Sequence, residues 1–261
     1  MKTFEQKYKN KIIQGDCIEV MKEMEDESVD CVITSPPYNV GIEYENYNDK
    51  REWEDYKEFI KKWTSEVYGV LKRDGRVAIN IPYEVNVTDR GGRRFILSDY
   101  WQIMQEIGFN FAGIVDLKED NPHRVKLTAW GSWLSPSAPY IYNPKECVLI
   151  AYKSEWKKQS KGISYFNNKN KKEFQNLTSG IWEYEAEKKK WTEANFSLGL
   201  PMKALKILTF ENELVLDPFL GSGTTALACK KMKRNYIGIE LSEKYINVAK
   251  KRINNIQEKL L

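Results

Sequence analysis

The stretch Leu214-Val215-Leu216-Asp217-Pro218-Phe219-Leu220-Gly221-Ser222-Gly223-Thr224-Thr225 decides the fold. Its apolar start predicts a buried strand, and the glycines follow where a helix would begin. This is the setting in which a G-x-G-x-x-G/A pattern binds a nucleotide-like cofactor. A phosphate P-loop is excluded because no lysine follows the second glycine. The remaining choice lies between a dinucleotide and a cofactor of different charge.

The acid at the end of this strand favours the second option. Asp217 stands just before the glycines, where its carboxylate would repel a pyrophosphate. It would attract a cofactor that carries a sulfonium and an ammonium group, as S-adenosylmethionine (SAM) does. Glu240 ends the next strand, in the place of an acid that binds ribose hydroxyls in either case. We therefore expect a SAM site, with a dinucleotide site as the alternative.

The position of the glycine loop along the chain predicts the order of the sheet. Apolar runs predict seven strands, over residues 11–16, 29–33, 76–81, 111–117, 147–152, 213–216 and 236–239. Nucleotide-binding glycine loops normally follow the first strand, but here only one strand follows the loop. We expect an α/β fold with a doubly wound, circularly permuted, seven-stranded, mostly parallel sheet.

Helical spacing of apolar residues predicts helices over residues 17–24, 53–71, 200–208 and 224–232. Ser98 is expected to cap a helix that Gly108 ends, and Ser242 is expected to cap the last helix. Three connections are expected to be irregular. Asp74-Gly75 should end the helix over 53–71, residues 84–94 should form a flexible basic loop, and residues 39–51 a mobile one.

The composition of the chain limits the compartment in which we expect it and the kinds of catalysis that it could perform. No apolar run is long enough to cross a bilayer, and the polar N-terminus predicts no signal peptide. The four cysteines form no C-x-x-C pair, so we expect reduced thiols, no metal site and a cytoplasmic protein. His123 is the only histidine, which excludes a Ser-His-Asp triad unless that residue serves it.

A basic stretch separates the two halves of the chain. Residues 154–190 contain nine Lys and five Glu, so their net charge is +4, the same as that of the whole chain. Such a patch fits contact with a polyanion, although a solvated lysine-rich loop would have the same composition.

The second site that the sequence predicts is Thr34-Ser35-Pro36-Pro37-Tyr38, after the apolar run Val29–Ile33. Two prolines cannot continue a strand ladder, so a hydroxyl, unpaired carbonyls and an aromatic ring remain at the strand end. This set could hold a flat ligand with an amine, or the prolines could simply end the strand. In a doubly wound sheet the strand ends carrying Asp16, Ser35 and Asp217 should converge on one crevice.

These two motifs together resemble those of the β-class SAM-dependent DNA amino-methyltransferases, the N4-cytosine/N6-adenine DNA methylase family. In that class the Ser35-Pro36-Pro37-Tyr38 motif precedes the glycine motif that starts at Asp217. Gly15-Asp16, the strand that ends at Glu240 and the Phe196 segment extend the resemblance over most of the chain. It implies a Rossmann-like catalytic domain over residues 1–153 and 191–261, with a small target-recognition insertion over 154–190.

The resemblance also implies roles for individual residues. Ser35, Pro36, Pro37 and Tyr38 would be catalytic. Cofactor contacts are expected at Asp16, Cys17, Phe196, Asp217, Pro218, Phe219, Gly221, Gly223, Thr224 and Glu240. DNA contacts are expected at Arg90, Arg93, Arg94, Lys157, Lys158 and Lys161, and the stretch 130–139 would share that task.

The expected reaction is methyl transfer from SAM to the exocyclic N4 amine of cytosine in double-stranded DNA, by base flipping and direct in-line attack. Family members with serine at the first motif position mostly act on N4 of cytosine, and those with aspartate on N6 of adenine. The alternatives are N6-adenine methylation, methylation of RNA or a protein glutamine, and a catalytically silent DNA-binding module. Besides DNA, a cognate restriction endonuclease and a second copy of the chain are candidate partners in a prokaryotic or phage setting.

Overall fold

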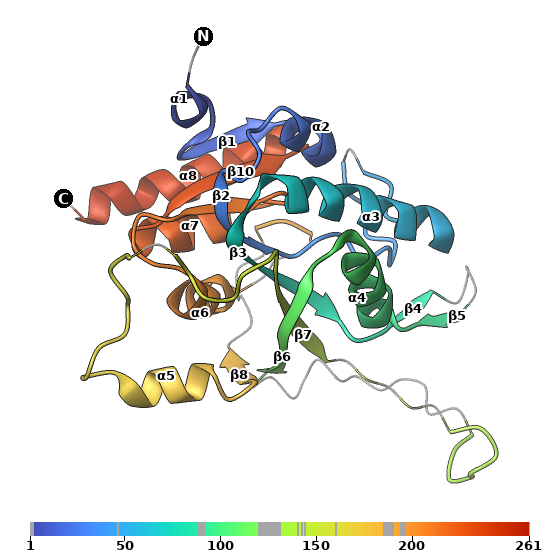
Figure 1. The fold of residues 1–261 in the computed structure, drawn as a ribbon. Helices are drawn as coiled ribbons and strands as arrows, with labels where there is room; N and C mark the ends of the chain where they lie inside the picture. Colours follow the sequence, from blue (N-terminus) through green and yellow to red (C-terminus); the bar gives the residue numbers. More distant parts are fainter. Residues whose placement is uncertain are drawn as a thin grey trace.

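The computed structural model describes residues 3–45, 47–87, 92–119, 132–139, 141, 143, 145–159, 161–184, 191–193 and 197–260. These residues build an eight-stranded sheet in the order β1-β10-β9-β2-β3-β7-β6-β8 (Figure 1). Its strands are β1 (Lys11–Gln14), β2 (Val29–Thr34), β3 (Leu71–Pro82), β6 (Asn110–Glu119), β7 (Glu146–Tyr152), β8 (Ile181–Tyr184), β9 (Leu214–Asp217) and β10 (Asn235–Glu240).

The order of the strands confirms the circular permutation. β9, which leads into the glycine loop, lies between β10 and β2. β7 is antiparallel to both of its neighbours, and the other neighbouring strands are parallel. All seven predicted strands belong to this sheet, and β8 adds an eighth from the basic stretch.

Helices cover both faces of the sheet (Figure 1). They are α1 (Phe4–Tyr8), α2 (Cys17–Lys22), α3 (Trp53–Val70), α4 (Ile96–Ile107), α5 (Lys171–Leu177), α6 (Gly199–Leu208), α7 (Thr224–Lys231) and α8 (Glu243–Leu260). Strand side chains alternate between the faces. Ile79 packs with the α3 and α4 side of the core, and Ala78 packs with the α6 and α7 side.

The helix over 53–71 was predicted to within one residue, but the expectation that Asp74-Gly75 ends it was wrong. α3 ends at Val70, and β3 begins at the next residue. Leu71 pairs with Val29 and Arg76 pairs with Cys31, so the residues between them form a bulge inside β3. Asp74-Gly75 lies in this bulge, where the Asp74 carboxylate accepts a hydrogen bond from the backbone amide of Gln159.

Two further local predictions were also wrong. α4 begins at Ile96, and Ser98 lies inside it without capping it, although Gly108 ends the helix in the left-handed region at φ 116°. The described part of residues 84–94 is a hairpin of β4 (Val85–Val87) and β5 (Gly92–Arg94). Alternation explains the hairpin, because Val85 and Val87 are both buried.

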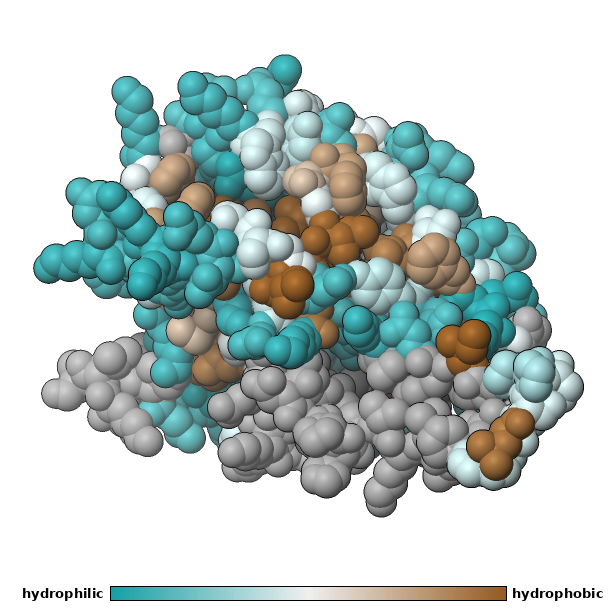
Figure 2. Space-filling view, turned by 90° about the horizontal axis from the view of Figure 1, so that it is seen from below, coloured by the Kyte–Doolittle hydropathy of each residue, from teal (hydrophilic) through white to brown (hydrophobic). Residues whose placement is uncertain are grey.

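The basic stretch contributes to the core as well as to the surface. Trp182 of β8 is 1% exposed, and its indole N–H donates to the carbonyl of Leu177 at the end of α5. The molecular face that carries α5 and β8 is mostly hydrophilic, with a small hydrophobic area near its middle (Figure 2). All four cysteines are free and buried, as expected. None of the helices in the described ranges is long and apolar enough to cross a membrane.

Lys158 shows that a lysine-rich stretch need not be solvated. Its side chain is 4% exposed, and Nζ lies 3.0 Å from the Glu213 carboxylate and donates to the Asp30 carbonyl at 3.2 Å. The prediction that Lys158 binds DNA is therefore wrong, since its charge is buried in a pair.

Replacing Lys158 with methionine should lower the free energy of unfolding by roughly 3–5 kcal/mol, because the buried Glu213 carboxylate would lose the positive charge that lies 3.0 Å from it. Urea denaturation measures this change. Lys157→Met is the matched control, since Lys157 is exposed, and it should change stability by less than about 0.5 kcal/mol. Equal stability of the two variants would contradict the structural role of Lys158.

Candidate active site

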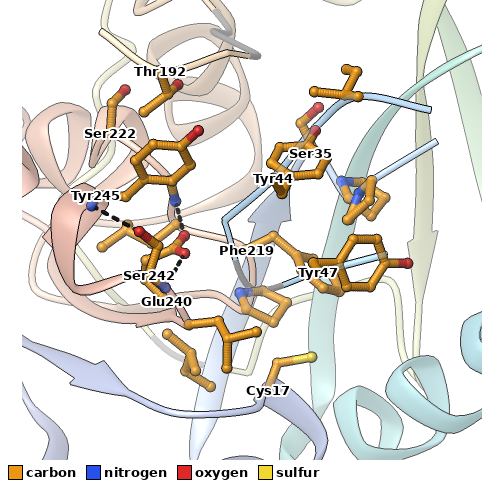
Figure 3. A pocket seen from close by; sticks show the side chains of 18 of the residues that line it. Cys17, Ser35, Tyr44, Tyr47, Thr192, Phe219, Ser222, Glu240, Ser242 and Tyr245 are labelled. Carbon is orange, nitrogen blue, oxygen red and sulfur yellow. Dashed lines mark hydrogen bonds between the residues drawn. The ribbon is translucent and has the colours of Figure 1, made fainter. Parts of the chain in front are cut away.

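One pocket of about 620 Å³ lies at the carboxyl ends of the central strands. The turns after β1, β2, β9 and β10 line it, together with α3, β3, β7 and the start of α8. In Figure 3, Phe219 lies in the middle of the pocket, with Glu240 and Ser242 on one side and Ser35 and Tyr44 on the other. Within the described ranges, no group of three or more His, Cys, Asp or Glu side chains could hold a metal ion.

The Glu240 carboxylate joins β10, α8 and the glycine loop. One of its oxygens accepts a hydrogen bond from the Gly221 amide at 2.8 Å, and the other accepts one from the Ser242 amide at 2.8 Å. Gly221 has φ 52°, a conformation that favours glycine. Burial raises the pKa of Glu240, and the amide donors oppose that rise. Each oxygen keeps a lone pair that a ligand hydroxyl in the pocket could use.

Asp217 lies behind the pocket and does not line it. The side chain is 1% exposed, and its Oδ1 accepts hydrogen bonds from Thr34 Oγ1 at 2.7 Å and from the Phe219 amide at 3.1 Å. Burial raises its pKa to about 6. The direct cofactor contact expected of Asp217 is therefore not the role that this geometry gives it. Gly223 likewise lies outside the lining, packed against Ala249.

The turn after β1 forms another wall of the pocket. Asp16 Oδ1 accepts hydrogen bonds from the amides of Ile18 and Glu19 and so caps α2. Gly15 donates to the Glu240 carbonyl, which fixes this turn beside β10. Cys17 also lines the pocket, where burial raises the pKa of its thiol and disfavours a thiolate.

The four residues of the proline motif line the opposite wall. Ser35 Oγ lies 2.8 Å from the Tyr38 hydroxyl, and that hydroxyl donates to the Asn80 carbonyl at 3.1 Å. The Tyr56 hydroxyl donates to the Pro37 carbonyl at 2.7 Å. In the described part of the chain no group donates to the Pro36 carbonyl, so this acceptor stays available.

The loop over residues 39–50 borders the pocket through Tyr44 and Glu45. Asp49 anchors it, because its buried carboxylate accepts hydrogen bonds from four successive backbone amides, those of residues 39–42. Glu45 accepts a hydrogen bond from Ser242 at 2.7 Å, which joins the loop to α8. Asp49 could not be recognised from the sequence, because one acid in a polar loop resembles any solvated residue.

Sequence reasoning also missed two polar residues of the wall beside the proline motif. Asn80 of β3 and Glu146 of β7 both line the pocket, and Asn80 Nδ2 donates to Glu146 at 2.9 Å. A polar residue at the end of an otherwise apolar strand was the available signal for Asn80.

The residues expected to contact DNA lie in two different places. Arg93 and Arg94 belong to β5, which pairs with β4 just beyond the carboxyl end of β3, the strand end that contributes Asn80 to the pocket. Lys157 and Lys161 are exposed at the opposite edge. Two backbone hydrogen bonds place this segment at the amino ends of the strands. The Ser154 amide donates to the Arg73 carbonyl near the start of β3, and the Glu211 amide just before β9 donates to the Ile163 carbonyl. Arg90 and Phe196 lie outside the described residues.

The chain is similar to known DNA methyltransferases. The family model described as "DNA methylase" (N6_N4_Mtase) matches residues 29–251. The type II methyltransferase M.MjaVI of Methanocaldococcus jannaschii is 38% identical over 179 residues, which cover 69% of this chain and 87% of that protein.

Two solved structures are also similar. The M1.HpyAVI–SAM complex is 25% identical with a TM-score of 0.62 and covers 94% of this chain and 99% of its own. The fold also matches the PvuII cytosine-N4-specific DNA methyltransferase, at 20% identity and a TM-score of 0.72, over 95% of this chain and 88% of that one.

The raised pKa of Asp217 predicts how stability depends on pH. The folded chain binds this proton more tightly than the unfolded chain, so the free energy of unfolding should fall as pH rises from about 4 to about 6. A shift of two pKa units corresponds to about 3 kcal/mol. Asp217→Asn keeps an oxygen acceptor and should lack this fall when unfolding by urea is measured at several pH values. The exposed Asp55→Asn control should keep the wild-type slope, and an equal slope in Asp217→Asn would contradict the assignment.

Proposed function

We propose that this chain, which belongs to the N6/N4 DNA methylase family, methylates the N4 amine of cytosine in double-stranded DNA. It is a SAM-dependent DNA amino-methyltransferase. The choice of cytosine rests on Ser35, the residue at the first position of the proline motif. The observation that carries the proposal is one pocket in which this motif faces the wall formed by Glu240 and the glycine loop.

The residues of that wall fit SAM. Ligand pockets commonly measure about 300–1,000 Å³, so about 620 Å³ suits a cofactor of this size. Glu240 would accept hydrogen bonds from the ribose hydroxyls, and Asp16 would face the adenine amine. Phe219 would pack against the cofactor. When bound, SAM supplies an electrophilic methyl group.

The proline motif would supply hydrogen-bond acceptors that make the amine of a nucleobase more nucleophilic. The lone pair of an exocyclic amine is delocalised into the ring, which makes the nitrogen a poor nucleophile. Ser35 Oγ and the Pro36 carbonyl would each accept one N–H, which lets the nitrogen become pyramidal and frees the lone pair. Tyr56 already occupies the Pro37 carbonyl, so Pro36 provides the free acceptor. As the N–C bond forms, the bond from the methyl carbon to the sulfonium sulfur would break and its electron pair would stay on the sulfur. The ammonium product would then be acidic enough to release a proton to solvent, so no strong base is required.

The target base must leave the helix to reach this site. Flipping costs roughly a few kcal/mol, which contacts with the flipped base and the DNA backbone must offset. The ring of Tyr38 would stack on the base. Arg93 and Arg94 would contact DNA on the pocket side, together with the loop over residues 132–139, where Trp133 is 65% exposed. Residues 154–190 would form the inserted target-recognition region between the parts 1–153 and 191–261 of the catalytic domain.

The relatives support a proposal about the setting of the reaction. M.MjaVI is a type II methyltransferase, so we propose a cognate restriction endonuclease that cuts the unmethylated sequence. A protein that modifies the host genome would act in the cytoplasm of a prokaryotic cell. Assembly into a homodimer remains a prediction that sedimentation can test.

Mass spectrometry of nucleosides tests the proposed base. DNA from a methylation-deficient host that expresses the chain should contain N4-methylcytosine, and a host that expresses Ser35→Ala should contain about 100-fold less, because one of the two acceptors is lost. N6-methyladenine in place of N4-methylcytosine would overturn the choice of base. If no methylated base is found while the purified chain still binds DNA, the chain is a silent binding module.

Titration calorimetry tests the cofactor wall. Glu240→Gln should weaken SAM binding by about 10- to 100-fold, because the ribose would lose hydrogen bonds to a charged group. Glu19→Gln is the control, since Glu19 lies outside the pocket on α2 and pairs with Lys22, and it should bind SAM as the wild type does. Unchanged affinity in folded Glu240→Gln would contradict the ribose assignment.

A further inference from the structure

We propose that the Tyr38 hydroxyl is a positioning group that fixes the direction of the Ser35 proton. In this arrangement Ser35 presents only lone pairs to the target amine. The inference rests on the proposed function and adds to it a role for the phenol oxygen that is separate from the stacking of the ring.

Counting protons sets the direction of the hydrogen bonds. The Asn80 carbonyl can only accept, so the single proton of the Tyr38 hydroxyl is donated to it, across 3.1 Å. The contact of 2.8 Å between Ser35 Oγ and the Tyr38 oxygen then needs the serine proton. Ser35 therefore donates to Tyr38, and both lone pairs of Ser35 Oγ remain as acceptors.

The last acceptor in this chain of hydroxyls is held firmly. Asn80 lies in β3 opposite Val148 of β7. Its side chain donates to Glu146 at 2.9 Å and to the Cys147 carbonyl at 3.3 Å, which ties this part of β3 to the neighbouring strand a second time. Burial raises the pKa of Tyr38, so the phenol keeps the proton that it must donate.

This direction matters because a serine hydroxyl can act in two opposite ways. As an acceptor from an amine N–H, it helps to free the nitrogen lone pair. As a donor to the nitrogen, it would occupy the lone pair that must attack the methyl group. A serine that rotates freely populates both states, whereas an aspartate carboxylate can only accept. Tyr38 thus gives the neutral serine the one-way character of a carboxylate.

The test removes the phenol oxygen and keeps the ring. Tyr38→Phe should lower kcat for DNA methylation about tenfold, with the dissociation constants for DNA and SAM within about twofold of wild type. Tyr8→Phe is the control, because the Tyr8 hydroxyl also donates to a backbone carbonyl, that of Glu23, and Tyr8 is buried away from the pocket. It should leave kcat unchanged. Thermal melting confirms that both variants are folded.

A second pair of variants distinguishes a positioning role of the Tyr38 hydroxyl from a merely structural one. In Ser35→Asp, which has no hydroxyl proton to direct, adding Tyr38→Phe should change the remaining single-turnover rate by less than about twofold. A tenfold loss in that background as well would overturn the inference, and so would wild-type kcat in Tyr38→Phe. If the wild-type chain methylates no DNA, the proposed function fails instead.

Discussion

The hydrogen bond of 2.7 Å between Thr34 and Asp217 joins the two halves of the site. These residues are 183 positions apart, and each ends one of two neighbouring strands, β2 and β9. The same carboxylate oxygen also accepts the Phe219 amide at the start of the glycine loop. Burying an ionisable acid at this point raises its pKa and costs stability at neutral pH, but it fixes the proline motif against the glycine loop.

The permuted order of the sheet makes this contact possible. β9 lies beside β2, so a motif near the N-terminus and one near the C-terminus leave the same edge of the sheet. The remaining walls follow from the same edge, because the turns after β1 and β10 also open there. Asp16 and Glu240 each use carboxylate oxygens to bind backbone amides, which gives both turns a defined shape before any ligand is present.

Features that depend on short stretches could be predicted from the sequence. Apolar runs located the seven strands, and the two motifs located opposite walls of the pocket. Features that depend on distant partners could not be predicted. Lys158 looked solvated because its partner Glu213 lies 55 residues further along the chain. β8 could not be predicted because the burial of Trp182 depends on its contacts with α5 and the edge of the sheet. The bulge at Asp74-Gly75 could not be predicted because the same two residues also occur in turns that end a helix.

In the mechanism that we propose, the site works mainly through acceptors and their orientation, which explains why this chemistry would need no histidine. An amine that attacks a methyl group loses its proton after the bond has formed, so a strong base would add little. What the amine needs is two acceptors aimed at its hydrogens. The Pro36 carbonyl has no proton and cannot point the wrong way. Ser35 could point its proton at the nitrogen, and in the proposed arrangement its bond to Tyr38 removes that freedom by giving its only proton a fixed acceptor. A neutral hydroxyl would then replace a carboxylate as the acceptor without adding another charge near the buried Asp217.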